Sequence, residues 1–107
     1  CLAPDIVFEA PYYRPDAPLA SSRDAMSSMF DVMAEKFSSL DYRVERFIPA
    51  LDPDLVIAEV KGNNGVAGTD RFYRNDYLFL VDVRDGAITR IFEYSNPVVY
   101  ARDVDGH

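Results

Sequence analysis

The spacing of apolar residues changes once along this chain, near residue 41, and this change restricts the folds that the chain can adopt. Between residues 21 and 40, apolar side chains recur at intervals of three and four, as on one face of an amphipathic helix. After the helix, from Tyr42 to Ile48, apolar and polar residues alternate, which is typical of half-buried strands. The sequence therefore predicts one helix followed by a sheet.

The predicted helix begins at the Ser21-Ser22 pair and ends near Leu40. A serine side chain there can cap free backbone N–H groups, and Asp24 favours the positive end of the helix dipole. The apolar stripe of this helix consists of Met26, Met29, Phe30, Met33 and Phe37. Before the helix, residues 6–10 are expected to form a strand and residues 11–18, with three prolines, an irregular loop.

Four strands are expected after the helix, at residues 42–48, 55–61, 71–83 and 87–94. Gly62-Asn63-Asn64-Gly65 is expected to form a tight turn, because Gly and Asn adopt positive φ readily. Arg84-Asp85-Gly86 is expected to form a hairpin turn. After Asn96-Pro97, residues 98–100 are expected to continue the last strand past a bulge. The short connections imply an antiparallel meander.

Length and composition favour one globular domain over residues 1–107. A chain of 107 residues suffices for one compact domain, and the 49% hydrophobic residues can fill its core. The net charge of −7, without a basic stripe, disfavours binding to nucleic acid or to an anionic membrane. No apolar run approaches the roughly 20 residues of a membrane span.

The chain lacks the usual residues of metal and cofactor sites. Its one cysteine, Cys1, cannot form an internal disulfide, which fits a reducing compartment such as the cytoplasm. Its one histidine, His107, is the last residue, so no His/Cys cluster is available for a metal. A Gly-rich phosphate loop and a Gly-x-Ser-x-Gly elbow are also absent from the sequence. We therefore expect no cofactor and no metal.

Residues 73–97 carry a set of short motifs. Tyr73-x-Asn75-x-Tyr77-Leu78 leads through Val81-Asp82-Val83 and Asp85-Gly86-x-Ile88 to Glu93-Tyr94-x-Asn96-Pro97. This run resembles the C-terminal half of SnoaL-like proteins of the nuclear-transport-factor-2-like superfamily, and is most similar to the phenazine-biosynthesis A/B type. The resemblance covers almost the whole chain. It is specific for fold rather than for activity, because this fold carries many activities.

The resemblance implies an α+β cone, a roll in which a curved antiparallel sheet of five to six strands packs against helices. It also implies an apolar pocket for a small-molecule ligand at the open end, and a homodimer formed through the outer face of the sheet. The first helix of the family would precede Cys1, so we expect further residues before the start of this sequence.

Two glutamates are candidate catalytic residues. Glu93 lies on a strand, and the matching Glu of phenazine A/B-like proteins lines the pocket and transfers a proton or holds an amine. An apolar pocket would raise its pKa, whereas the alternative is a surface Glu paired with Arg90 or Arg74. Glu59 could supply a second carboxyl group to the same pocket, or form a cross-strand ion pair on an exposed face.

Further residues are candidates for substrate binding. Tyr73, Asn75 and Tyr77 share one strand face, where they could donate hydrogen bonds to a substrate oxygen or belong to a packed core. Three residues of the helical stripe, Met29, Phe30 and Met33, could form an adaptable ligand wall or plain core. Tyr13 lies on the proline-rich loop, which could contact substrate or be an ordinary surface loop.

Two positions depart from the family pattern. The resemblance places Ala10 where ketosteroid isomerases carry a basic Asp, and Met29 where phenazine A/B proteins carry a catalytic His. Neither residue can transfer a proton. Two classes of function therefore stay open. One is a cofactor-independent acid–base enzyme of isomerase, cyclase or dehydratase type, acting on a small, largely apolar substrate. The other is a non-catalytic ligand-binding or dimeric interaction domain.

Overall fold

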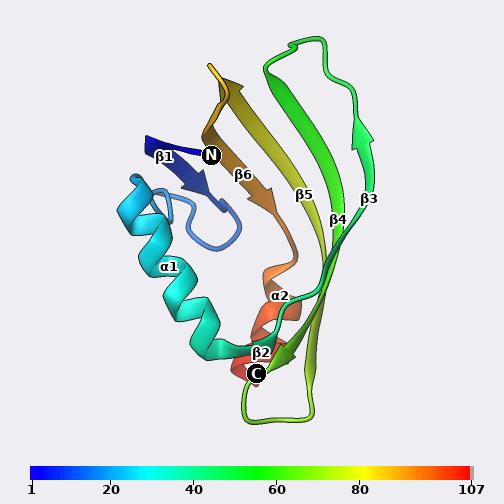
Figure 1. The fold of residues 1–107 in the computed structure, drawn as a ribbon. Helices are drawn as coiled ribbons and strands as arrows, with labels where there is room; N and C mark the ends of the chain where they lie inside the picture. Colours follow the sequence, from blue (N-terminus) through cyan, green and yellow to red (C-terminus); the bar gives the residue numbers. More distant parts are fainter. Residues whose placement is uncertain (107) are drawn as a thin grey trace.

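One long helix lies across the concave side of a strongly curved sheet, and a shorter helix lies near the lower end (Figure 1). The computed structural model describes residues 1–106. Its elements are β1 (Leu2–Glu9), α1 (Arg23–Lys36), β2 (Phe37–Ser39), β3 (Tyr42–Ile48), β4 (Leu55–Val66), β5 (Phe72–Arg84), β6 (Ala87–Tyr94), α2 (Pro97–Tyr100) and a π-helical turn (Ala101–Asp105). Within this part of the chain, no helix has the length and apolar character needed to cross a membrane.

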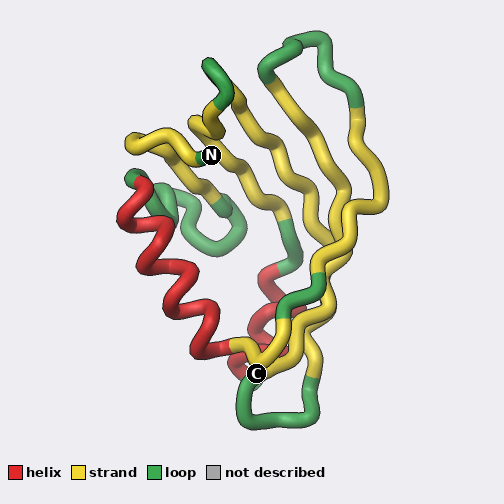
Figure 2. Tube along the Cα trace, viewed as in Figure 1, coloured by secondary structure: helices red, strands yellow, loops and turns green. Residues whose placement is uncertain are grey.

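The strands form one sheet in the order β1-β6-β5-β4-β2, with β3 also paired to β4 (Figure 2). The strands from β2 to β6 pair in antiparallel fashion, whereas β1 pairs with β6 in parallel. The expected α+β architecture with a curved sheet of five to six strands is therefore confirmed. The sheet is mixed because β1, from the start of the chain, pairs in parallel with the free edge of β6.

The helix begins as predicted but ends earlier. Ser22 caps it, since its Oγ accepts the Ala25 N–H at 3.0 Å. The chain turns extended at Phe37, four residues after Met33, because residues 37–39 pair with the end of β4. The predicted helix end near Leu40 was wrong: a long-range pairing replaces the last helical turn.

The segment Gly62-Asn63-Asn64-Gly65 is part of β4, so the predicted tight turn was wrong. A Cβ atom on Gly62 would lie 2.8 Å from Tyr77 Cε2, and one on Gly65 would lie 2.7 Å from Ser38 Oγ. Neither glycine adopts a positive φ angle. These glycines therefore allow neighbouring side chains to approach the strand, and the connection to β5 forms at residues 67–71 instead.

The turn between β5 and β6 forms as predicted, whereas the segment after β6 does not. Asp85 and Gly86 have φ angles of 52° and 78°, which confirms the hairpin turn between β5 and β6. The predicted strand at residues 98–100 was wrong, because these residues lie in α2. Asn96 caps α2 by accepting the Val98 N–H at 2.9 Å, and Pro97 occupies the first turn, where its missing N–H is not needed.

Candidate functional site

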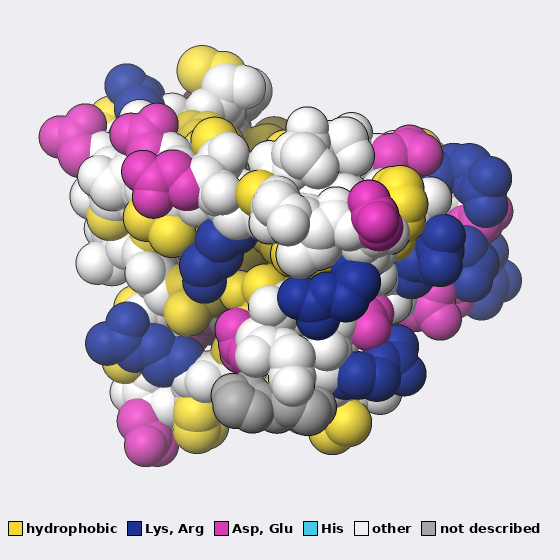
Figure 3. Space-filling view, turned by 90° about the horizontal axis from the view of Figure 1, so that it is seen from below, with side chains coloured by type: hydrophobic (Ala, Val, Ile, Leu, Met, Phe, Trp, Pro, Cys, Tyr) yellow, Lys and Arg dark blue, Asp and Glu magenta, His cyan; other side chains and the backbone are white. Residues whose placement is uncertain are grey.

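A cavity of about 340 Å³ lies between α1, the concave face of the sheet and α2. Its lining residues are Phe8, Tyr13, Leu19, Met29, Val32, Met33, Lys36, Phe37, Tyr42, Tyr73, Tyr77, Glu93 and Tyr100. Seen from below, the molecule is hollowed, and hydrophobic side chains in the hollow are flanked by basic ones (Figure 3). Most of the lining is aromatic or apolar, with one acidic and one basic side chain.

Glu93 is the acidic side chain of this cavity. It lies on β6 opposite Phe79 of β5, and its Oε2 accepts a hydrogen bond from Ser95 Oγ at 3.4 Å. Burial raises the pKa of the Glu93 carboxyl group to about 7, and the hydrogen bond from Ser95 opposes this change. A carboxyl group with such a pKa can both accept and donate a proton near neutral pH.

Neither of the arginines considered as surface partners pairs with Glu93. Arg90 forms an ion pair with Glu9 at 2.7 Å, and the Nε of Arg74 donates to Asn63 Oδ1 at 3.1 Å. Within residues 1–106, no ion pair of Glu93 occurs. The Glu93 side chain therefore lines the cavity and forms no surface ion pair with these arginines, and its catalytic role stays a prediction.

Glu59 does not share the cavity with Glu93, so of the two alternatives left open for it the pocket position is wrong. Its side chain is 41% exposed and forms a bidentate ion pair with Arg46, with both N–O distances 2.9 Å. Arg46 pairs with Glu59 across β3 and β4, and the hydrogen bonds from Arg46 lower the pKa of the Glu59 carboxyl group. The cross-strand ion pair, the alternative from the sequence, is what forms. Side chains of neighbouring residues along a strand point to opposite faces of the sheet, and the Glu59 side chain points to the face away from the cavity.

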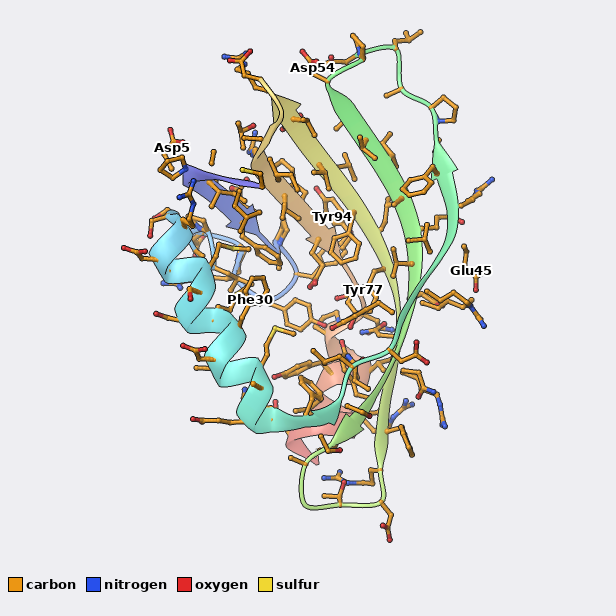
Figure 4. The ribbon with its side chains drawn as sticks, viewed as in Figure 1. Asp5, Phe30, Glu45, Asp54, Tyr77 and Tyr94 are labelled. Carbon is orange, nitrogen blue, oxygen red and sulfur yellow. The ribbon has the colours of Figure 1, made fainter. Side chains whose placement is uncertain are left out.

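The tyrosines predicted near the site converge on the cavity. Tyr73 and Tyr77 are 4% and 6% exposed, and both line the cavity together with Tyr13 from the loop after β1. Figure 4 shows Tyr77 on the side of the sheet that faces α1, whereas Glu45 points away from β3. Burial raises the pKa of the Tyr77 and Tyr13 hydroxyl groups, so both stay neutral at physiological pH.

Asn75 does not line the cavity, although it shares a strand with Tyr73 and Tyr77. Its Nδ2 donates to the Tyr73 hydroxyl at 2.7 Å and to the Asn96 carbonyl oxygen at 3.0 Å. Both amide hydrogens are therefore used inside the protein. Asn75 therefore has no free amide hydrogen at this cavity, and its contact with substrate stays a prediction.

The helical residues divide between cavity and solvent. Met29 and Met33 line the cavity as expected, whereas Phe30 does not line it and is 49% exposed. The cavity-facing row continues instead through Val32 and Lys36, which the sequence interpretation missed. The signal was present, since these positions repeat at the three- and four-residue spacing of a helix face.

Two further polar contacts at the cavity were also missed. Tyr42 accepts a hydrogen bond from Nδ2 of the fully buried Asn64 at 3.1 Å, and Asn64 Oδ1 accepts the Asp41 N–H at 3.0 Å. Lys36 Nζ donates to the Tyr100 hydroxyl at 3.1 Å and links α1 to α2. No local signal indicated the first contact, because Asn64 lies in a segment whose residues are typical of a turn. In the described part of the chain, no cluster of three or more acidic, Cys or His side chains could hold a metal.

Comparisons with known proteins identify the family. The sequence matches the family model described as SnoaL-like domain over residues 1–91. The fold is shared with a phenazine biosynthesis-related protein from Pseudomonas aeruginosa, which is 16% identical, with a TM-score of 0.82 over 97% of this chain and 67% of that chain. A proposed isomerase from Bacillus subtilis is 26% identical, with a TM-score of 0.81 over 99% and 77% of the two chains.

A third solved structure with this fold is IdmH, a proposed polyketide cyclase from Streptomyces antibioticus. It is 23% identical, with a TM-score of 0.72 over 92% of this chain and 77% of that chain. No curated protein matches the sequence at a significant level. Because the family model covers 91 of the 107 residues, the chain belongs to the SnoaL-like domain family.

Proposed function

We propose that this protein is a cofactor-independent acid–base enzyme of isomerase, cyclase or dehydratase type, with Glu93 as the proton-transfer group. The observation that carries the proposal is the Glu93 carboxyl group, which is enclosed by aromatic side chains and has a pKa of about 7. Such a group exchanges protons efficiently with a bound molecule at neutral pH. The solved relatives described as a proposed polyketide cyclase and a proposed isomerase support this class of reaction.

The substrate is a small, largely apolar molecule that carries an oxygen atom. The cavity volume of about 340 Å³ lies at the small end of the usual range for ligand pockets, about 300–1,000 Å³. Tyr42 accepts its hydrogen bond from Asn64, and Tyr100 accepts one from Lys36, so both tyrosines retain a hydrogen for a ligand oxygen. A ligand oxygen held by these hydroxyl groups would place the adjacent carbon–hydrogen bonds inside the cavity with Glu93.

Binding and catalysis can be tested separately with 2-tetralone, an apolar bicyclic ketone with exchangeable α-hydrogens. We expect wild-type protein to bind it in an NMR titration. Met29→Trp, which fills the cavity, should abolish binding, and Phe30→Trp, at a half-exposed position of the same helix that does not line the cavity, should retain it. If both variants bind 2-tetralone, or if neither does, the cavity is not the ligand site.

Catalysis is measured as exchange of the α-hydrogens of 2-tetralone for deuterium in D₂O. Wild-type protein should accelerate exchange, and Glu93→Gln should reduce the rate by about 100-fold or more, as expected for loss of a general base. Glu59→Gln is the matched control, because Glu59 lies in a surface ion pair. Binding without accelerated exchange would instead favour the alternative from the sequence, a non-catalytic ligand-binding domain.

We further propose that two copies associate through the outer face of the sheet. Apolar side chains on this face are only partly buried, and Leu78 pairs with Tyr94 and Leu80 with Phe92 across β5 and β6. Covering these side chains would remove apolar area from water. Sedimentation equilibrium should give the mass of a dimer for wild-type protein and of a monomer for Leu80→Arg. A wild-type monomer at micromolar concentration would contradict the proposal.

A further inference from the structure

Lys36 is the one basic side chain among the described residues that line the cavity. It is exposed at the last position of α1, whereas Tyr73 and Tyr77 of the same cavity are buried. Lys36 therefore lies where the cavity opens to solvent. Within residues 1–106, Lys36 takes part in no ion pair, because the five pairs that form there involve other cations. Its charge is consequently available to a negatively charged group of a ligand.

The Tyr100 hydroxyl group lies beside this cation. Lys36 Nζ donates to Tyr100 Oη at 3.1 Å, and it lies 5.8 Å from the centre of the Tyr100 ring. An ammonium group has three hydrogens, so two remain after this bond, and the Tyr100 hydroxyl keeps its own hydrogen. The Tyr100 ring packs edge to face against Tyr13 and Tyr73, with centroids 5.6 and 5.4 Å away. Two neighbouring donors, one of them charged, suit the two oxygen atoms of a carboxylate group.

The charge around the cavity favours an anionic ligand as well. Basic side chains flank the hollow that contains the hydrophobic ones (Figure 3), although the chain as a whole carries a net charge of −7. Positive charge at the mouth of a cavity raises the local concentration of anions. Because Lys36 is exposed, a carboxylate bound to it would keep part of its hydration, which limits the cost of desolvation.

We propose that Lys36 and Tyr100 bind a carboxylate group of the ligand, so that the substrate is an apolar carboxylic acid whose apolar part extends into the cavity. This inference rests on the function proposed above, because it takes the cavity as the substrate site. Glu93 is the only other charged side chain among the described lining residues, and it would repel a carboxylate. The two charges therefore orient the ligand, with its carboxylate at the mouth. Lys36 is the residue that determines this specificity.

The test compares two probes with the same ring system and different charge, 2-naphthoate and 2-naphthamide, in NMR titrations. Measurements at pH 6 lie below the Glu93 pKa of about 7, so most Glu93 is neutral and repels the naphthoate little. We expect wild-type protein to bind 2-naphthoate about 5-fold more tightly than 2-naphthamide, or better. Lys36→Met removes the charge and should abolish this preference while still binding the amide. Lys36→Arg should retain the preference.

Lys61→Met is the matched control, because it removes the same charge from a residue that pairs with Asp76 and does not line the cavity. It should leave the preference for 2-naphthoate unchanged. Adding NaCl to about 0.5 M should weaken the preference in wild-type protein and in Lys61→Met, and should have no effect on Lys36→Met. A merely structural role of Lys36 would instead change the affinity for both probes equally.

The outcomes separate this inference from the proposed function. If wild-type protein binds 2-tetralone but does not prefer 2-naphthoate, or if Lys36→Met keeps the preference, the carboxylate site is overturned alone. If the preference depends on Lys36 but exchange of 2-tetralone is not accelerated, the inference stands and catalysis by Glu93 falls. Binding of neither 2-tetralone nor the two naphthalene probes overturns both. If Lys36→Met does not fold, Tyr100→Phe removes the second donor and should lower the preference, and an unchanged preference overturns the inference.

Discussion

A Cβ atom added to Gly62 would lie 2.8 Å from Cε2 of Tyr77, so the glycine on β4 makes room for an aromatic ring of the cavity. The same added Cβ atom would lie 3.3 Å from Cε1 of Tyr42. The rings of Tyr42 and Tyr77 meet edge to face with their centroids 5.8 Å apart. A strand position without a side chain therefore determines how two lining residues pack.

Replacing this glycine should displace a cavity ring. Gly62→Ala is expected to lower the free energy of unfolding by about 1–3 kcal/mol, as for other overpacked sites, because Tyr77 is buried and cannot move aside freely. Urea unfolding measures the change. Asn63→Ala, at the next residue but on the exposed face, is the control and should have little effect. Equal stability of Gly62→Ala and wild type would show that the ring has free space.

The raised pKa of Glu93 predicts a pH-dependent stability. The folded-state pKa of about 7 exceeds the ordinary 4.5, so between these values the folded state binds more protons than the unfolded state. The free energy of unfolding therefore falls as the pH rises through this window. Glu93→Gln cannot ionise and should be more stable than wild type by as much as about 3 kcal/mol at pH 8, and by much less at pH 5.

Glu59→Gln is the matched control for this experiment, because the contribution of Glu59 to the free energy of unfolding changes with pH in the opposite direction. The hydrogen bonds from Arg46 lower the pKa of Glu59, so this carboxylate contributes stability above its ordinary pKa and loses it as the pH falls through the folded-state pKa. Glu59→Gln should therefore not gain stability at pH 8. Parallel pH profiles for wild type and Glu93→Gln would mean that Glu93 is solvated.

The buried amide of Asn64 should contribute to stability through two polar partners. Asn64 is fully buried, accepts the Asp41 N–H and donates to the Tyr42 hydroxyl. Asn64→Ala leaves the Asp41 N–H without this acceptor and should lower the free energy of unfolding by about 1–3 kcal/mol. It should also shift the Tyr42 ring signals in NMR spectra, whereas Asn63→Ala should leave them in place. Unchanged Tyr42 signals would contradict the contact.

The N-terminal cap of α1 gives a further prediction. Ser22 Oγ accepts the Ala25 N–H at 3.0 Å, and Ser22→Ala should lower the free energy of unfolding by about 1 kcal/mol. Ser21→Ala is the neighbouring control and should have a smaller effect, since Ser22 is the capping residue. A larger effect at Ser21 would place the helix start one residue earlier.

Several elements could be predicted from the sequence because short-range effects determine them. The bounds of β3 and β6 agree with the predicted ranges 42–48 and 87–94, which are rich in β-branched and aromatic residues. The turn at Asp85-Gly86 and the cap at Ser22 likewise depend on φ preferences and hydrogen bonds within a few residues. The motifs of residues 73–97 indicated the family, which the match over residues 1–91 confirms.

The errors arose where a distant partner overrides a local preference. Gly62 and Gly65 are typical turn residues, yet they remain in β4 because Tyr77 and the serines of β2 approach them closely. Phe37 fits the helical stripe but pairs with Val66 of β4 instead. In each case, contacts between residues more than ten positions apart outweigh a preference that is worth about 1 kcal/mol or less per residue.

The sequence by itself determined β3, β6, the start of α1 and the turn between β5 and β6, and it indicated that Glu93 is a candidate site residue. Only the tertiary structure decided which of two similar glutamates is enclosed: Glu93 lies in the cavity, while Glu59 pairs with Arg46 on the exposed face. It also gave both amide hydrogens of Asn75 partners inside the protein, the Tyr73 hydroxyl and the Asn96 carbonyl oxygen. The physical reason is that spacing sets local conformation, whereas burial and hydrogen-bond partners depend on residues that meet only when the sheet curves around α1.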